Sequence, residues 1–225
     1  MMFNDWTILL IIPGLILGIW AQSKVRRAYK KYSKVQTKNN ISGAAAANIV
    51  LNSNGVYDVA IEPGRGELTD HYDPAHKKIV LSEKIYSTSS VAAVAIAAHE
   101  CGHALQHANA YSLIKFRTAI VPVANFGSFA TYILIVLGLI FSYPPLISIG
   151  IVLFCVVVLF YAVTYPVEVN ASKRALFAIQ NLNILDSSEL PMAKKVLDAA
   201  ALTYFAALIS SLLTLLRLIL ISRRR

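Results

Sequence analysis

The sequence predicts a mainly α-helical membrane protein in which three or four apolar helices carry a small α+β domain. Three observations lead to this prediction. Hydrophobic residues make up 56% of the 225-residue chain, more than in an ordinary soluble domain. Long apolar runs recur near both ends and in the middle of the chain. Between the first and second runs lies a polar stretch with alternating segments and turn signals, a pattern typical of short strands.

The first apolar run covers residues 7–21 and is flanked by Trp6 and Trp20, a placement typical of aromatic side chains at a membrane interface. Its fifteen residues would span only about 22 Å as a helix, and Pro13 lies within it, so we expect a short anchor. A cleaved signal peptide carries basic residues before its apolar core, whereas here they follow it. Residues 1–21 are therefore predicted to be a retained membrane anchor with its N-terminus outside the cell.

Two longer apolar runs follow, over residues 118–141 and 145–163. Each can cross about 30 Å of hydrocarbon as a helix, and no charged residue occurs between Arg117 and Glu168. Two buried helices of a soluble protein would need a partner that covers nearly every side of both. Residues 118–163 are therefore predicted to be a transmembrane hairpin.

A fourth apolar run, over residues 199–220, carries a polar stripe. Thr203, Ser210 and Arg217 recur at heptad spacing, which turns one face of a helix toward protein or water. The C-terminal segment 199–225 is therefore predicted to be an apolar helix that either spans the membrane or docks against the polar part of the chain.

Basic residues determine the expected orientation in the membrane, and the formal net charge is +9. Seven of them cluster directly after the first anchor: Lys24, Arg26, Arg27, Lys30, Lys31, Lys34 and Lys38. A basic cluster that adjoins an apolar segment indicates the cytoplasmic side of a membrane rather than a nucleic-acid surface. Residues 22–117 and 164–198 are thus expected in the cytoplasm. The arginines at 223–225 would lie outside if the fourth run crossed the membrane, which favours docking of that run.

The cytoplasmic segment 22–117 is predicted to contain a basic stretch and an α+β part. The expected elements are a helix at 41–51, a strand at 56–62, a β hairpin with strands at 68–72 and 78–82, and a helix that begins after 87–90 and ends near residue 110. Asp73 and Pro74 suit a type I turn between the hairpin strands. The edge strand of this hairpin could pair with an extended substrate.

The last of these helices carries the sequence His99-Glu100-Cys101-Gly102-His103. Two histidines four residues apart lie on one face of a helix, one turn apart. Neutral imidazoles bind zinc, and a glutamate beside the first histidine can take a proton from zinc-activated water. We therefore predict one Zn²⁺ per chain, bound by His99 and His103, with Glu100 as general base. The eight apolar residues before the motif cannot cross a bilayer, which argues against an intramembrane site.

Catalytic zinc usually takes three protein ligands and leaves one position to water. His107 continues the spacing, but three histidines along one straight helix span about 12 Å and cannot converge. Four carboxylates follow the motif: Glu168, Asp186, Glu189 and Asp198. Glu168 is the preferred third ligand because it begins the helix 164–198 where the hairpin returns to the cytoplasm. A carboxylate there also complements a helix dipole, and four acidic residues upstream of the motif remain alternatives: Glu62, Glu67, Asp70 and Asp73.

The two cysteines are not candidate ligands. Cys101 lies about 200° around its helix from His99, facing away from the predicted metal, and Cys155 lies inside the third apolar run. Both are expected to be buried free thiols in a reducing compartment.

Three stretches of the chain carry a resemblance to a known family: AHECGHALQ at 98–106, DHYDP at 70–74 and PVEVNAS at 166–172. Together with the N-terminal anchor and the apolar hairpin, they resemble the YugP-like family, classed as neutral zinc metallopeptidases of the bacterial membrane. The likeness covers nearly the whole chain. It implies a zincin-like catalytic domain of the HExxH, gluzincin type at the cytoplasmic face, with His99, His103 and Glu168 as zinc ligands and Glu100 as general base.

A more distant similarity is to the HtpX-like and CAAX-type zinc peptidases, in which an aspartate four residues after the ligand glutamate orients a zinc histidine. This chain has Ser172 at that position. Zinc-bound imidazoles usually donate their other N–H to a neighbouring group, and Asp70, Asp73 or Asn170 could accept it. An oxyanion donor is also needed, with three candidates by chemistry alone: His71, Tyr165 and Tyr204.

The expected function is a membrane-bound zinc metalloendopeptidase that hydrolyses peptide bonds with zinc-activated water. The expected partners are the lipid bilayer and a peptide or membrane-protein substrate, and no nucleic acid. The expected location is the bacterial cell membrane, with several spans and the catalytic site facing the cytoplasm. Two alternatives remain: a zinc-bearing membrane scaffold or regulator with residual or no peptidase activity, and a structural membrane protein without zinc.

Overall fold

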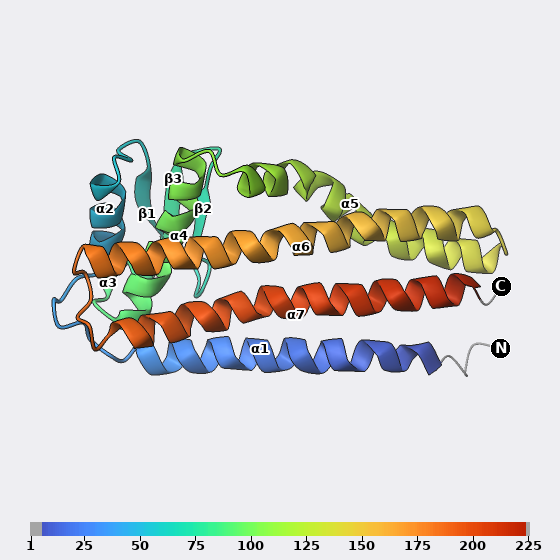
Figure 1. The fold of residues 1–225 in the computed structure, drawn as a ribbon, viewed down its shortest axis with the longest axis horizontal. Coiled ribbons are helices and arrows are strands. Elements are labelled where there is room, and N and C mark those ends of the chain that lie inside the picture. The colour runs from blue at the N-terminus through green and yellow to red at the C-terminus, as the bar shows by residue number, and fades with distance from the viewer. Residues whose placement is uncertain (1–5, 224–225) are drawn as a thin grey trace. The chain divides into compact units, whose positions relative to one another are not determined.

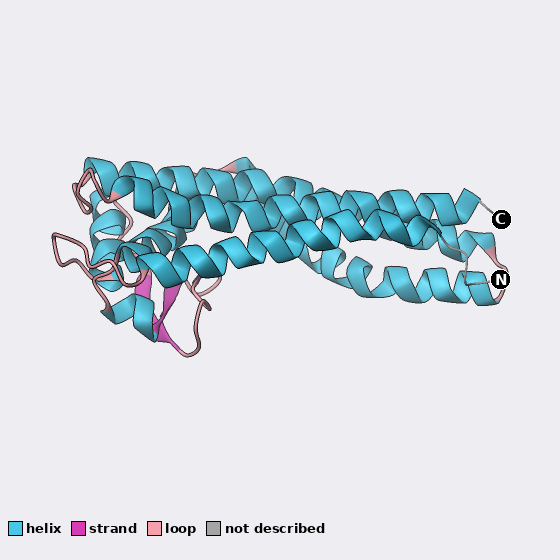
Figure 2. Ribbon diagram, turned by 90° about the horizontal axis from the view of Figure 1, so that it is seen from below, coloured by secondary structure: helices cyan, strands magenta, loops and turns pink. Residues whose placement is uncertain are grey.

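The computed structural model describes residues 6–223, and within them the chain is mainly helical with a small three-stranded sheet (Figures 1 and 2). The helices are η1 (Trp6–Leu10), α1 (Ile11–Tyr32), α2 (Gly43–Ser53), α3 (Glu83–Ser87), α4 (Val91–Ala108), α5 (Ser112–Ile140), α6 (Pro144–Asn181) and α7 (Leu190–Arg223). The strands are β1 (Ala60–Gly64), β2 (His71–Asp73) and β3 (Lys78–Ser82). Arg224 and Arg225, used above to judge the orientation of the C-terminus, lie outside the described residues.

The described chain divides into two compact units. The first unit comprises residues 6–22, 113–166 and 202–223, and the second comprises residues 23–112 and 167–201. Four helical segments between residues 6 and 223 are long and apolar enough to cross a membrane: Trp6–Tyr32, Ser112–Ile140, Pro144–Asn181 and Leu190–Arg223. The prediction of a mainly helical protein with apolar helices and a small sheet is confirmed.

All four of these helices are longer than the predicted apolar segments, and α5 begins at Ser112 rather than at residue 118. α1 does not stop at residue 21 but continues through the basic cluster to Tyr32. Pro13 lies in its first turn, where a proline is tolerated because the N–H groups of that turn form no hydrogen bond within the helix. α6 is continuous through residue 163 and tolerates Pro166 inside it. Glu168 therefore lies on the second helix of the hairpin itself, not on a separate helix. α7 is uninterrupted and begins at Leu190, ahead of the predicted start at 199.

The first unit packs its apolar helices through small residues and a few polar contacts. Thr131 on α5 donates to the carbonyl of Gly150 on α6 (3.2 Å), and Ser210 on α7 donates to the carbonyl of Gly14 on α1 (3.0 Å). The predicted polar stripe of the fourth run thus includes a residue turned toward protein. Large apolar side chains on these helices stay exposed, including Phe129 at 72%, which is the surface expected of helices in contact with lipid.

The second unit contains the sheet, whose strand order is β1-β3-β2. β2 and β3 form the predicted antiparallel hairpin, with Tyr72 opposite Ile79. β3 matches its predicted range, whereas β1 begins four residues later than the predicted strand at 56–62 and pairs with β3 in parallel. The core of this unit is formed largely by α4, whose residues from Val91 to Ala95 are fully buried.

A polar clamp closes the second unit at the loop between α6 and α7. The carboxylate of Glu189 is buried (3% exposed) and accepts hydrogen bonds from the backbone N–H of Lys38 (2.9 Å) and of Asp186 (2.8 Å). The ammonium of Lys38 donates a hydrogen bond to the carboxylate of Asp186 (2.8 Å). This hydrogen bond is the main reason that the pKa of Asp186 lies below its ordinary value. Two of the four carboxylates that follow the motif thus have structural partners away from the histidines.

Candidate metal centre

The helix α4 is positioned by its N-cap and by burial of its apolar turns. The hydroxyl of Ser90 accepts a hydrogen bond from the backbone N–H of Ala93 (3.2 Å), which satisfies one of the free donors at the helix start. The helical period then places His99 and His103 on one face, with ring centroids 4.8 Å apart and ring planes at 85°.

Gly102 determines how closely α6 approaches α4. A Cβ atom at this position would lie only 2.5 Å from the carbonyl oxygen of Ala171 on α6, so glycine is required for the two backbones to come this near. Since Ala171 lies one turn from Glu168, the close crossing carries the carboxylate of α6 to the two histidines of α4.

The three residues predicted as zinc ligands converge. One carboxylate oxygen of Glu168, Oε2, lies 3.2 Å from Nε2 of His99 and 3.4 Å from Nε2 of His103, and the three candidate ligand atoms all lie within 4.8 Å of one another. In a tetrahedron with bonds of about 2.0–2.1 Å to a central zinc, neighbouring ligand atoms are about 3.3–3.4 Å apart. The donor set, and the distances from Glu168 to each of the two histidines, therefore fit a zinc ion.

The cluster is largely shielded from solvent. Glu168 is 2% exposed and His103 9% exposed. Burial lowers the pKa of His103, but the hydrogen bond with Glu168 and the negative charges of Glu100 and Glu168 outweigh it, so that the pKa is raised above its ordinary value. The ring is thus held in a negative environment, which favours a bound cation.

Glu100 lies next to His99 in the chain and is 8% exposed. Among residues 6–223, no group donates a hydrogen bond to its carboxylate. A buried carboxylate normally has a hydrogen-bonding partner, and one without is available to water or a ligand.

Two residues that the sequence analysis did not predict as partners contact the outer nitrogens of the histidine rings. Ser172 Oγ lies 3.1 Å from Nδ1 of His99. Gln106 Oε1 lies 3.0 Å from Nδ1 of His103, three residues away on the same helix. Helical spacing could have identified Gln106, whereas Ser172 is brought to His99 only by the crossing of α4 and α6.

The predicted outer partners Asp70 and Asp73 do not reach the histidines. Asp70 accepts hydrogen bonds from the backbone N–H (2.7 Å) and hydroxyl (3.0 Å) of Ser82. Asp73 accepts from the backbone N–H of Ala75 (2.9 Å) and bonds the ring of His76, as expected of an aspartate that begins a turn. Of the three predicted partners, Asn170 alone joins the network, through Gln106 rather than through a histidine.

Within residues 6–223, none of the remaining candidates belongs to the group of three side chains that could hold a metal. Glu62 pairs with Lys78 and Glu67 with Lys84 at the surface. The ring of His107 lies 5.5 Å from that of Tyr72 on β2. Of the suggested oxyanion donors, His71 bonds the carbonyl of Thr69, and Tyr165 and Tyr204 belong to the first unit.

The cysteine predictions are half right. Cys101 is fully buried, and burial raises the pKa of its thiol, whose sulfur lies 3.6 Å from the carbonyl oxygen of Ala47. Cys155, expected to be buried, is instead exposed on α6.

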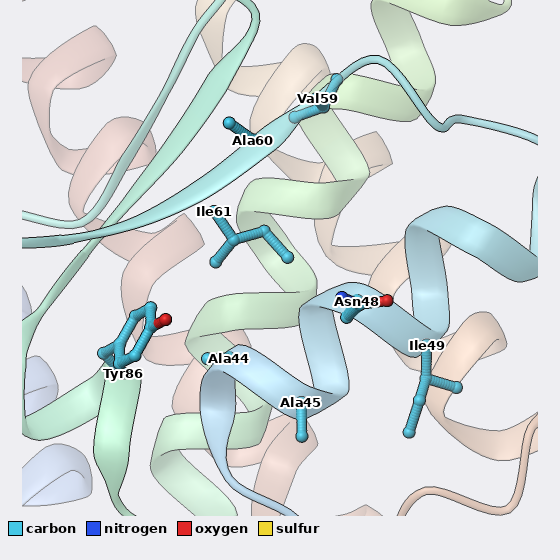
Figure 3. Close-up of a pocket in the computed structure, with 8 residues that line it drawn as sticks. All are labelled: Ala44, Ala45, Asn48, Ile49, Val59, Ala60, Ile61 and Tyr86. Atoms are coloured by element: carbon cyan, nitrogen blue, oxygen red, sulfur yellow. The ribbon is translucent and has the colours of Figure 1, made fainter.

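A surface groove of about 630 Å³ lies elsewhere in the second unit, between α2, β1 and α3 (Figure 3). It is lined by Ala44, Ala45, Asn48, Ile49, Val59, Ala60, Ile61 and Tyr86. None of these is a residue of the converging cluster, so the groove is separate from the candidate metal centre.

Comparison with known proteins gives two matches along nearly the whole chain. Residues 7–223 match the model of a family described as "Putative neutral zinc metallopeptidase". The chain is 45% identical over 214 residues to a protein of Bacillus subtilis (strain 168) named "Putative membrane protease YugP", and the alignment covers 95% of each chain. No solved structure gives a significant match.

Proposed function

Because the chain belongs to the family described as "Putative neutral zinc metallopeptidase", we propose that it is a membrane-bound zinc metalloendopeptidase. His99, His103 and Glu168 bind one zinc ion, and Glu100 is the general base. The observation that carries this proposal is the spacing of the three ligand atoms, which lie within 4.8 Å of one another beside a buried carboxylate.

A bound zinc ion would supply Lewis acidity, which polarises the scissile carbonyl and makes a water molecule more acidic. Glu100 accepts the proton of the attacking water and passes it to the leaving amine. Its carboxylate suits this task because it accepts no hydrogen bond from residues 6–223 that would compete for the proton. Ser172 and Gln106 orient the two histidine rings through their contacts with the Nδ1 atoms.

The substrate is proposed to bind in an extended form along β2. This strand is at the edge of the sheet, and Tyr72 on it contacts His107 on α4, the helix that carries the histidines. An edge strand can pair with an extended peptide through backbone hydrogen bonds. Membrane proteins and their cytoplasmic tails are the proposed substrates, since α6 carries Glu168 only a few residues beyond its apolar run.

The proposed location is the bacterial cell membrane, crossed several times, with the catalytic site in the cytoplasm. Two features support this orientation. The basic cluster of residues 24–38 directly follows the first apolar run, as the positive-inside rule expects. The 38 residues of α6 span about 57 Å as a helix, which exceeds a hydrocarbon thickness of about 30 Å, so the part with Glu168 can extend beyond the bilayer.

The test compares Glu100→Gln and Glu168→Ala with the wild-type chain purified in detergent, measuring bound zinc and cleavage of an unfolded protein substrate. Glu100→Gln should keep one zinc per chain and lose about 100-fold or more of the activity. Glu168→Ala should weaken zinc binding. Glu62→Gln is the matched control, since Glu62 pairs with Lys78 at the surface, and it should change neither quantity.

Each alternative gives a different result in this experiment. Unchanged turnover in Glu100→Gln would refute the role of Glu100 as base. Zinc without any turnover in the wild-type chain would favour a scaffold, and a wild-type chain that takes up no zinc would favour a structural membrane protein. Unchanged zinc binding in Glu168→Ala would show that Glu168 is not the third ligand, and the acidic residues upstream of the motif would again be the candidates.

A further inference from the structure

Gln106 is fully buried and hydrogen-bonded at both ends of its side-chain amide. Its Nε2 donates to the carbonyl of Val167 (2.8 Å) and to Oδ1 of Asn170 (3.0 Å), and its Oε1 faces Nδ1 of His103 (3.0 Å). The side chain thus links α4 to α6 and also contacts a candidate zinc ligand.

Arg174 determines which atoms of Asn170 and Gln106 donate and which accept in these hydrogen bonds. Its Nε donates to Oδ1 of Asn170 (2.8 Å), and because a guanidinium can only donate, the atom of Asn170 that faces it must be the oxygen. The same oxygen faces Gln106, so the facing atom of Gln106 must be the donating nitrogen. The carbonyl of Val167, which can only accept, requires the same orientation.

His103 is the last member of this series of hydrogen bonds. With both N–H groups of the amide used on α6, the oxygen of Gln106 is the atom that faces the ring, and an oxygen of this kind only accepts. Nδ1 of His103 must therefore carry a proton, which leaves the lone pair of Nε2 for a metal. His99 is not constrained in this way, since the hydroxyl of Ser172 can either donate or accept.

We infer that Gln106 is a positioning residue: held by Arg174 through Asn170, it keeps His103 in the Nδ1–H form and directs Nε2 at the metal. This inference rests on the proposed function in one respect, that His103 binds zinc. Partners of this kind commonly change metal affinity about 10–100-fold when they are lost.

Two substitutions at Gln106 distinguish a role in orienting His103 from a role that only holds α4 and α6 together. Gln106→Met has a similar volume but removes all three hydrogen bonds. Gln106→Glu keeps an acceptor for the N–H of His103 and loses both donors to α6. If the residue orients His103, the Glu variant binds zinc more tightly than the Met variant. If it only ties α4 to α6, the Glu variant binds no better than the Met variant, because its charge opposes two acceptors.

The experiment measures the zinc dissociation constant of the full chain by competition with a chromophoric chelator, together with the visible absorption of the cobalt-substituted protein. Gln106→Met should weaken zinc binding about 10–100-fold and alter the cobalt spectrum, and Gln106→Glu should recover most of the affinity. Wild-type affinity in Gln106→Met, or equal affinities of the two variants, would overturn the inference.

Variants further from the metal decide the question if Gln106→Met does not fold. Arg174→Gln removes the donor that sets the direction of the network and should weaken zinc binding by about 10-fold. Its matched control is Lys173→Gln, since Lys173 is exposed on the same helix. Equal zinc affinities of the two would overturn the inference. A wild-type chain without zinc would instead refute the proposed function, and the inference with it.

Discussion

Replacing Gly102 by alanine should separate α4 from α6 and weaken zinc binding. The added Cβ would lie 2.5 Å from the carbonyl oxygen of Ala171, 3.0 Å from its carbonyl carbon and 3.1 Å from its Cα. All three are backbone atoms, so no flexible side chain can move aside. Ordinary contact begins near 3.4 Å, and the helices must therefore separate by about 0.9 Å at this point.

The size of the effect follows from this displacement. Overpacking a tight contact costs about 1–3 kcal/mol. Ligand distances in a metal site tolerate only about 0.2 Å, so α6, with Glu168 one turn from Ala171, must return to its original position when zinc binds. If all of this cost is subtracted from the free energy of zinc binding, the dissociation constant for zinc rises about 5- to 150-fold, at 1.4 kcal/mol for each factor of ten.

The assay is competition with a chromophoric chelator on the full chain in detergent, with thermal unfolding of the metal-free protein alongside. Gly18→Ala is the matched control, because a Cβ at Gly18 on α1 meets nothing within 4 Å, and it should bind zinc as the wild type does. A Gly102→Ala protein with wild-type zinc affinity would refute the reasoning that the close crossing of α4 and α6 aligns Glu168 with the histidines.

Three further predictions concern buried and paired groups outside the candidate metal centre. Glu189→Gln replaces one of the two accepting oxygens by an NH2 group, which faces one of the two backbone N–H groups, and should cost about 1–3 kcal/mol; an unchanged thermal midpoint would contradict the clamp described above. A Cys155→Ser protein should react with Ellman's reagent only after unfolding, because Cys101 is fully buried; rapid labelling of the native protein would show that α4 opens. Since Lys38 lowers the pKa of Asp186, this pair stabilises the fold above the ordinary aspartate pKa and the stabilisation is lost as the pH falls through the lowered value. Lys38→Met should therefore lose less stability than the wild type in an acid titration, and an equal loss would argue against the pair.

Local patterns in the sequence predicted the elements that depend on near neighbours. The apolar runs correspond to four long helices, and the serine-rich stretch before α4 provides its N-cap, Ser90. β3 was predicted correctly, since its alternating residues bury one face. β1 was shifted because its parallel pairing with β3 depends on a contact that no local pattern encodes.

The partners of the histidines show the limit of sequence reasoning. Asp70 and Asp73 have suitable chemistry, but hydrogen bonds to nearby groups occupy both carboxylates. Ser172, 73 residues from His99 in the chain, takes the position instead. Gln106 lies on the correct face of α4 by periodicity alone, but its orientation depends on Val167, 61 residues away.

By itself, the sequence determined that His99 and His103 share a face with Glu100 beside them, since the helical period is a local property that three or four residues establish. The tertiary structure decided which carboxylate meets them and which groups orient them. Glu168 reaches the histidines because Gly102 lets two helices approach to backbone contact, and such an approach depends on the packing of segments more than sixty residues apart. The candidate metal centre is thus predicted by the periodicity of one helix and completed by the crossing of two.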